Sequence, residues 1–322
     1  VKGCAVTVTN KSTGLFTTVK ISNGLEKDST GNYIVSGAYD LAYVSENISE
    51  LNKASFVVDS DIDMSELSAF SPIGGTLVPF SGKFNGNGHT ISNIKINGTS
   101  KSGLFASLYN AEISNLTISS AQINAKGLYS AILAGQITGN TKLSGITITD
   151  SKVISDGLYS GIVAGSINSG SIDVSDISID NCSVISKANY VGTFAGYASC
   201  DGQVTNVNIA DTTVNGAEYV AGVVGLAEGK LAVKSVTADG MKIKGVSEVS
   251  GVAAGKGEVS VANVKVVSSE VATIADSSAF VAGGIASSFG SSISDVELRN
   301  TVVKAGVASA VVGKAIPDAK LS

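Results

Sequence analysis

The sequence predicts an all-β protein, a right-handed parallel β-helix of about seven repeats with a capping region at its N-terminal end. Three observations support this. A seven-residue block recurs about every 30 residues, a strand-type block follows most copies of it, and the chain has 37 glycines but only 3 prolines in 322 residues. The right-handed sense follows the general preference of crossovers between parallel strands.

The first block begins with an aromatic or apolar residue and ends with a small one. Clear copies occupy residues 129–135, 159–165, 190–196, 219–225 and 249–255, and weaker copies occupy 101–107, 280–286 and 307–313. From last residue to last residue the spacings are 28, 30, 31, 29, 30, 31 and 27. This period is too short for a propeller blade, and the copies lack the 3.6-residue periodicity of a helical solenoid.

The second block has apolar residues at its places two, four and nine, the alternation of a half-buried strand. Place six is held by residues that tolerate tight turns: Ser120, Asp150, Asn181, Asp211, Gly240, Ser268 and Asn300. The block therefore predicts a strand, a bend and a second strand, and one rung should stack on the next at about 4.8 Å.

The front of the chain lacks the repeat, so we divide it into a cap at residues 1–90 and a β-helix domain at residues 91–322. Within the cap, apolar residues at helical spacing in residues 39–53 predict a short amphipathic helix. Such a cap would cover the edge that an open solenoid end exposes.

Composition excludes several classes of function. The net charge is −5, which argues against a nucleic-acid partner, and Arg299 and His89 are the sole arginine and histidine. No apolar run reaches the roughly 20 residues of a membrane helix. Cys4 could be lipidated or an ordinary cysteine. For Cys182 we favour a buried free thiol, with a Cys182–Cys200 disulfide as the alternative.

Two places could hold a metal ion or a catalytic base. Asp59, Asp61 and Asp63 alternate as calcium ligands can, but Met64 and Phe70 stand where a calcium loop of the EF-hand type needs glycine and glutamate. We interpret the segment as a strand with solvent-facing acids, and His89 as part of a turn. We therefore expect no metal, no cofactor and no catalytic residues.

One aromatic column is the candidate binding site. Its members stand at the start of the first block: Tyr129, Tyr159, Tyr190, Tyr219 and Phe280. Residues at one place of successive rungs stack, so the column forms either an internal aromatic ladder or an exposed stripe that could bind sugar rings. The small residues that follow in the next column favour the ladder.

The first block also places apolar residues next to each other, as in Ile132–Leu133 and Ile162–Val163. In a strand the two residues of each pair would point to opposite faces, so both faces would be apolar. A strand of a lone solenoid should instead have one face exposed to solvent. Either loops cover the outer face, or an exposed apolar stripe binds another domain or a second copy of the chain.

Parts of the sequence resemble bacterial GLUG-repeat proteins. Residues 39–43, 56–64, 70–74 and 79–91 look like the segment that leads into those repeats, and Gly103-Leu104-Phe105 is similar to the start of the repeat itself. Proteins of this family are secreted or surface-attached and adhesin-like, and their repeats also occur beside peptidase domains. The resemblance implies location and architecture, and it implies no catalytic residues.

Together these features indicate a non-catalytic, secreted or cell-surface bacterial protein for adhesion or ligand binding. Its partner would be a ligand on a host or neighbouring cell, with glycans among the candidates, and flanking domains or self-association are further options. A structural spacer is one alternative. A glycan-active enzyme is the weaker one, because the carboxylates are scattered over the rungs instead of clustered.

Overall fold

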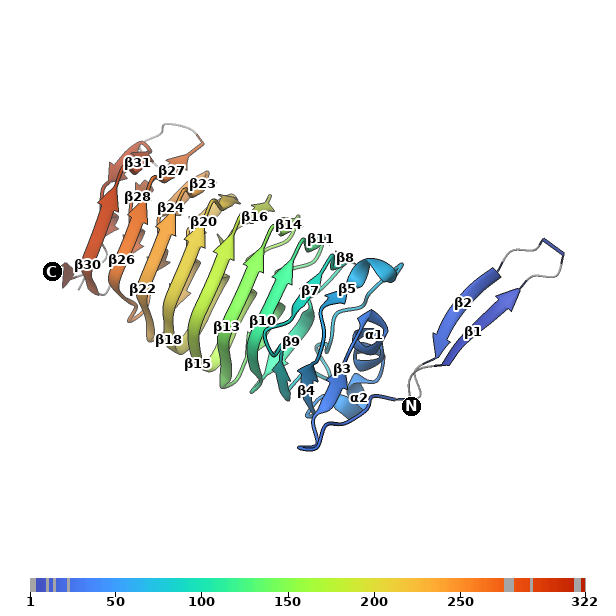
Figure 1. Ribbon diagram of the computed structural model, residues 1–322. Helices are drawn as coiled ribbons and strands as arrows, with labels where there is room; N and C mark the ends of the chain where they lie inside the picture. Colours follow the sequence, from blue (N-terminus) through green and yellow to red (C-terminus); the bar gives the residue numbers. More distant parts are fainter. Residues whose placement is uncertain are drawn as a thin grey trace.

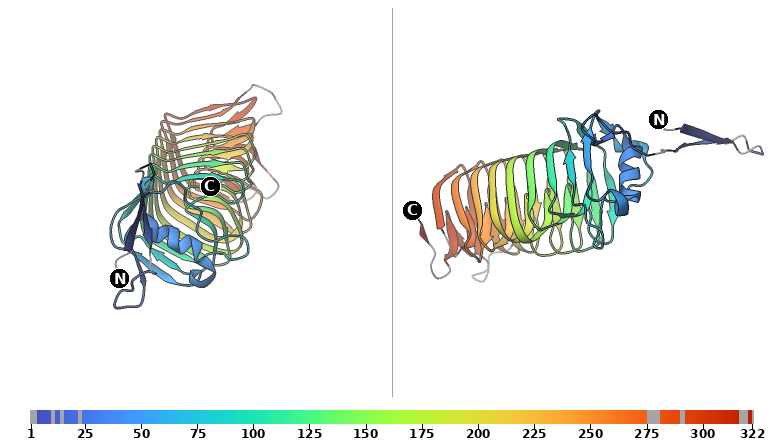
Figure 2. Two further views of the ribbon diagram at one scale, coloured as in Figure 1. Left: turned by 90° about the vertical axis from the view of Figure 1, so that its right-hand side faces the viewer. Right: turned by 90° about the horizontal axis from the view of Figure 1, so that it is seen from below.

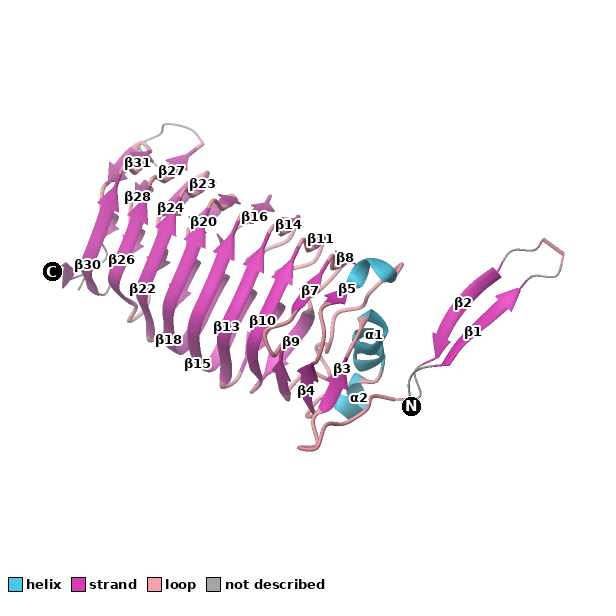
Figure 3. Ribbon diagram, viewed as in Figure 1, coloured by secondary structure: helices cyan, strands magenta, loops and turns pink. Residues whose placement is uncertain are grey.

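The computed structural model describes residues 4–9, 12–13, 16–21, 24–274, 281–289, 292–315 and 320–321. The chain forms a parallel β-solenoid of about eight turns, whose strands stack side by side along one long axis (Figures 1 and 3). The predicted parallel pairing is confirmed: Leu116 lies beside Ile146, and Ile146 beside Ile177, in parallel register.

Each turn contributes strands to distinct faces of the solenoid. The first face contains β9 (Phe105–Tyr109), β12 (Ala134–Thr138), the start of β15 (Ala164–Asp180) and of β18 (Ala195–Ala210), β21 (Val224–Glu228), β25 (Ala253–Gly255), β29 (Ala286–Phe289) and β33 (Val312–Ala315).

The second face continues from the first, because β15 and β18 run through both. It contains β3 (Tyr33–Val35), β4 (Ser55–Val58), β5 (Ile62–Asp63), β6 (Lys83–Asn85), β7 (Thr90–Ser92), β10 (Glu112–Ser119), β13 (Thr141–Thr149), β22 (Leu231–Asp239), β26 (Ser260–Val267), β30 (Ser292–Arg299) and β34 (Lys320–Leu321).

Two narrower sheets close the turns. One contains β8 (Lys95–Gly98), β11 (Gln122–Ala125), β14 (Lys152–Ser155), β16 (Ser183–Ser186), β19 (Thr213–Asn215), β23 (Lys242–Gly245), β27 (Glu270–Thr273) and β31 (Val302–Lys304). The other contains β17 (Val191–Gly192), β20 (Glu218–Ala221), β24 (Ser247–Ser250), β28 (Val281–Gly283) and β32 (Val307–Ser309).

The predicted bend at place six of the second block is confirmed. All seven residues there adopt the left-handed backbone region, with φ between 44° at Asp211 and 65° at Gly240. Asn, Asp, Ser and Gly adopt this region at lower cost than other residues. Two neighbouring side chains of this column also bond to each other, since Asn181 Nδ2 donates to Asp150 Oδ1 at 2.7 Å.

The N-terminal end of the solenoid is closed by helices. The predicted amphipathic segment forms α1 (Ala38–Glu46) and α2 (Ile48–Leu51), and Leu41 and Val44 are fully buried. A 3-10 helix, η1 (Met64–Glu66), follows β5. Parallel pairing already begins between β3 and β4 and continues to β6 and β10, so the coil extends into the segment that the sequence assigned to the cap.

A two-stranded antiparallel hairpin, β1 (Cys4–Thr9) and β2 (Phe16–Ile21), precedes the solenoid. Figures 1 and 2 show that it projects away from the helical end, while the C-terminal strands lie at the opposite end.

The neighbouring apolar residues of the first block do not lie on two faces of a strand. Ile132 and Leu133 lie at a bend just before β12, and both are fully buried in the core, as are Ile162 and Val163. A bend lets successive side chains turn to the same side. The exposed apolar stripe is therefore wrong.

We predict that Gly196→Ala strongly destabilises the solenoid. A Cβ atom at this position would lie 2.3 Å from the Tyr190 carbonyl oxygen and 2.5 Å from the Ser160 nitrogen, and both are backbone atoms. The backbone would have to move, at a cost of about 2 kcal/mol or more in the free energy of unfolding. Urea unfolding followed by circular dichroism measures the loss.

Gly75→Ala is the matched control, because a Cβ there meets nothing within 4 Å. This variant should unfold within about 0.5 kcal/mol of the parent. Equal midpoints for the two variants would show that the glycine of the first block is not needed for close packing.

Candidate binding surface

The tyrosine column forms one continuous stack on the solenoid. Ring centroids are 5.2 Å apart between Tyr129 and Tyr159, 5.1 Å between Tyr159 and Tyr190, and 5.4 Å between Tyr190 and Tyr219. The planes of these pairs differ by 11°, 12° and 6° respectively. The fifth predicted member, Phe280, lies outside the described residues.

The rings are half-buried, so the column is a surface ladder and not an internal one. Three of the tyrosines occupy the left-handed region, with φ of 63° at Tyr159, 65° at Tyr190 and 55° at Tyr219. Glu248 holds the next place of the column with φ 52°. Bulky side chains rarely adopt this conformation, which costs roughly 1–2 kcal/mol per residue. The surrounding contacts must therefore hold these residues in place.

The glycine at the end of the first block is one such contact. Cβ atoms at Gly165, Gly196 and Gly225 would lie 2.7, 2.3 and 2.6 Å from the carbonyl oxygens of Tyr159, Tyr190 and Tyr219. The start and the end of the block thus pack backbone against backbone. This contact explains why a glycine recurs six residues after the tyrosine.

Lysines lie at both ends of the stack. Lys256 Nζ lies 4.4 Å from the centre of the Tyr219 ring and donates a hydrogen bond to its hydroxyl at 2.7 Å. At the other end, Lys101 Nζ lies 6.0 Å from the centre of the Tyr129 ring. Cations favour such positions over aromatic faces. Within the stack the faces are occupied by neighbouring rings, so a ligand would meet ring edges and hydroxyl groups instead.

Tyr197 belongs to the same cluster, although the sequence did not reveal it. Its ring lies 5.5 Å from Tyr159 at 55° and 5.8 Å from Tyr190 at 66°. Its hydroxyl donates to Glu228 Oε2 at 2.7 Å, and burial, followed by this bond, raises the pKa of Tyr197 to about 12. Register neighbours at its place are Ser166 and Leu226, so no aromatic repeat marks the position.

The hydroxyl groups along the stack differ in their partners. The hydroxyl of Tyr219 bonds to Lys256, and that of Tyr197 bonds to Glu228. Within the described part of the chain, the hydroxyls of Tyr129, Tyr159 and Tyr190 have no hydrogen-bond partner. Beside them, Asn189 Nδ2 donates to Glu218 Oε2 at 3.1 Å. The stack therefore offers a row of phenol groups, one per rung, next to an amide and a carboxylate.

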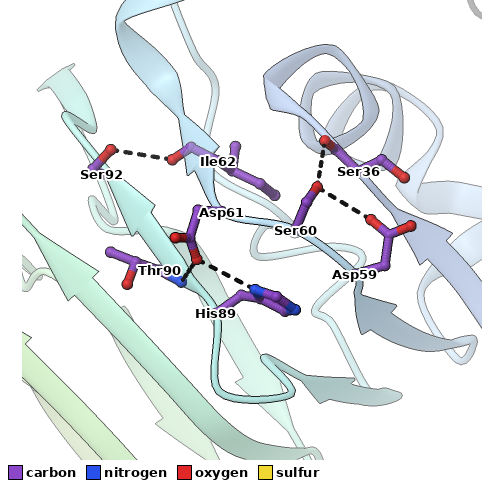
Figure 4. A network of polar contacts seen from close by, with 8 residues as sticks. All are labelled: Ser36, Asp59, Ser60, Asp61, Ile62, His89, Thr90 and Ser92. Carbon is purple, nitrogen blue, oxygen red and sulfur yellow. Dashed lines mark hydrogen bonds and ion pairs between the residues drawn. The ribbon is translucent and has the colours of Figure 1, made fainter.

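The three aspartates of the candidate calcium site bind different partners, and Figure 4 shows those of Asp59 and Asp61. Asp61 Oδ1 accepts from the Thr90 N–H at 2.9 Å and lies 3.3 Å from His89 Nδ1. The bond from Thr90, and then that from His89, lowers the pKa of Asp61. Asp59 Oδ1 accepts from the Ser60 hydroxyl, which also donates to the Ser36 carbonyl.

Asp63 caps η1 by accepting from the Ser65 N–H at 2.9 Å, and it also accepts from Asn93 Nδ2 at 2.8 Å. The aspartates are exposed, as the sequence predicted, but only Asp63 lies in a strand, β5, whereas Asp59 and Asp61 lie between β4 and β5. Across the described ranges, no group of three or more His, Cys, Asp or Glu side chains lies close enough to hold a metal ion. His89 lies just after the turn at Gly88, whose φ is 81°.

The cysteines also follow the favoured prediction. Cys182 and Cys200 are free thiols with exposed fractions of 3% and 4%, so the disulfide alternative is wrong. Burial raises the pKa of Cys182 to about 11 and that of Cys200 to about 12. The side chain of Cys4 lies outside the described residues.

Comparisons with known proteins bear on the fold alone. No family model matches the chain, and no curated protein matches it. A crystal structure from Bacteroides ovatus, solved under the name "putative immunoglobulin A1 protease", superposes with a TM-score of 0.58 at 16% sequence identity. The match covers 91% of this chain and 85% of that one. At this identity the likeness shows a shared solenoid architecture. In the described part of the chain, no helix is both long and apolar enough to cross a membrane.

We predict that the two buried thiols resist labelling in the folded protein. In a Cys4→Ser background, a chromogenic disulfide reagent at pH 8 should react about a hundredfold more slowly than with an exposed cysteine. The reason is that both pKa values lie about two or more units above the usual one. Two thiols per chain should react after denaturation. Fast native labelling, or fewer than two thiols in denaturant, would contradict the buried free state.

We also predict that Tyr190→Ala lowers the free energy of unfolding by about 2 kcal/mol, because Tyr190 contacts three other rings and each pair contributes about 0.5–1.5 kcal/mol. Tyr109→Ala is the control, since Tyr109 is 47% exposed. Denaturant midpoints measure both, and similar losses would mean that the stack adds little stability.

Proposed function

We propose that this chain is a non-catalytic ligand-binding module of a secreted or surface-attached bacterial protein, and that the tyrosine stack is its binding surface. The ligand would be a glycan on a host or neighbouring cell. The observation that carries the proposal is the row of phenol hydroxyls at Tyr129, Tyr159 and Tyr190, which have no hydrogen-bond partner among the described residues and repeat at the spacing of the rungs.

The stacking of the rings determines which groups of the tyrosines a saccharide could contact. Because the ring faces pack on one another, a sugar cannot lie flat between them. A linear saccharide that lies along the solenoid axis would instead accept hydrogen bonds from, and donate them to, the hydroxyls of successive tyrosines. Asn189 and Glu218, which lie beside Tyr190 and Tyr219 in the chain, add an amide and a carboxylate to the same row.

The conformational strain of the column also supports a binding role. Strained residues concentrate at functional sites, where the surrounding structure holds them. Asparagine or glycine would adopt the left-handed region at lower cost, yet three successive turns carry tyrosine there. The resemblance of residues 39–91 to segments of adhesin-like GLUG-repeat proteins is consistent with a location at the cell surface.

A glycan array tests the proposal. The double variant Tyr159→Phe/Tyr190→Phe removes two hydroxyls and keeps every ring contact, so it should fold normally and lose at least about tenfold in binding signal. Tyr109→Phe, which removes an exposed hydroxyl outside the stack, should bind as the parent does. If the double variant binds glycans as well as the parent, the stack is not the binding surface.

Absence of binding to every glycan would overturn the proposal too, and would favour a structural spacer. Release of reducing ends from any glycan by the parent protein would favour the enzyme alternative.

A further inference from the structure

A groove lies at one edge of the narrow sheet that contains β8, β11 and β14. It has a volume of about 400 Å³ and crosses three rungs, along the ends of β8, β11 and β14. The side chains that give it chemical character are Asn97, Thr99, Asn124, Lys126, Ile154 and Asp156. Its volume falls in the range of small-molecule sites.

Two stacked amides supply unsatisfied hydrogen-bonding groups to this groove. Asn124 Nδ2 donates to Asn97 Oδ1 at 3.0 Å. Within the described part of the chain this leaves Asn97 Nδ2 as a free donor and Asn124 Oδ1 as a free acceptor. In the next two rungs, Ile154 and then Ile185 occupy this place. The amide pair is therefore confined to the rungs of Asn97 and Asn124.

Two charged groups complete the polar wall. Asp156 forms an ion pair with Lys187 at 2.7 Å, and the hydrogen bond from Lys187 holds the pKa of Asp156 below its usual value. Asp156 is therefore an ionised acceptor at neutral pH, and the Lys126 ammonium is a donor. Ile154, 37% exposed, adds an apolar surface beside Asn124.

We propose that this groove binds one pyranose unit of a neutral saccharide. A sugar ring presents vicinal hydroxyls, each both donor and acceptor, and one apolar face. The groove offers donors at Asn97 and Lys126, acceptors at Asn124 and Asp156, and an apolar contact at Ile154. Each of these polar groups can form a hydrogen bond with a hydroxyl group, so the ligand needs no charge, and the charge of Asp156 is already paired with Lys187.

The groove is separate from the tyrosine stack, although the two are close along the chain. Lys126 and Asp156 each stand three residues before a tyrosine of the stack, Tyr129 and Tyr159. The groove proposal does not rest on binding by the stack, and either site could fail alone.

Saturation-transfer NMR with the full chain tests the groove. The probes are the methyl β-glycosides of glucose and galactose, and N-acetylglucosamine, each added alone. At least one should receive transfer from the parent protein. Asn124→Ala and, separately, Asp156→Asn should weaken that binding at least about tenfold. Asn208→Ala, an exposed asparagine on the second face, should leave it unchanged.

No transfer to any of the three sugars would overturn the proposal, and so would equal binding by the parent and both groove variants. Binding of the zwitterion glycine in place of the sugars would overturn it as well, since that would point to the charge pair alone. Circular dichroism confirms that each variant is folded. The double variant Tyr159→Phe/Tyr190→Phe should keep the sugar signal, which separates failure of the groove from failure of the stack.

Discussion

Parallel hydrogen bonding between successive rungs is the constraint on which the rest of this structure depends. Because each strand pairs in register with the strand one turn later, a residue at one place lies directly beside its counterpart in the next turn. Ile146, for example, lies between Leu116 and Ile177. A residue type that recurs at one place therefore forms a column, and a favourable pair in two rungs can extend into a ladder.

Because of this register, the contacts that stabilise the solenoid also position the candidate binding surface. The glycine at the end of the first block lets the tyrosine backbone approach closely. Ring stacking then offsets part of the cost of a left-handed backbone at Tyr159, Tyr190 and Tyr219. Folding and presentation of the hydroxyl row consequently rely on the same contacts, so few substitutions would alter one without the other.

Conflicts between local pattern and global fold explain where sequence-based expectations differ from the structure. Ile132 and Leu133 suggested a strand with two apolar faces, because periodicity cannot distinguish a strand from a bend that turns both side chains inward. Cys182 and Cys200 are close enough in sequence for a disulfide to be considered, but in the structure both are buried free thiols. Tyr197 has no counterpart in neighbouring rungs, so repetition gave no signal for it.

The sequence alone determined the repeat length, the parallel pairing, the bend at place six and the membership of the tyrosine column in the described rungs. These depend on local residue preference and on periodicity, which are visible along the chain. The tertiary structure decided how exposed that column is, that its ring faces are closed, and that Asn97, Asn124 and Asp156 share one groove. Such properties depend on side chains from different turns, about 30 residues apart in sequence, whose mutual orientation only the stacked fold fixes.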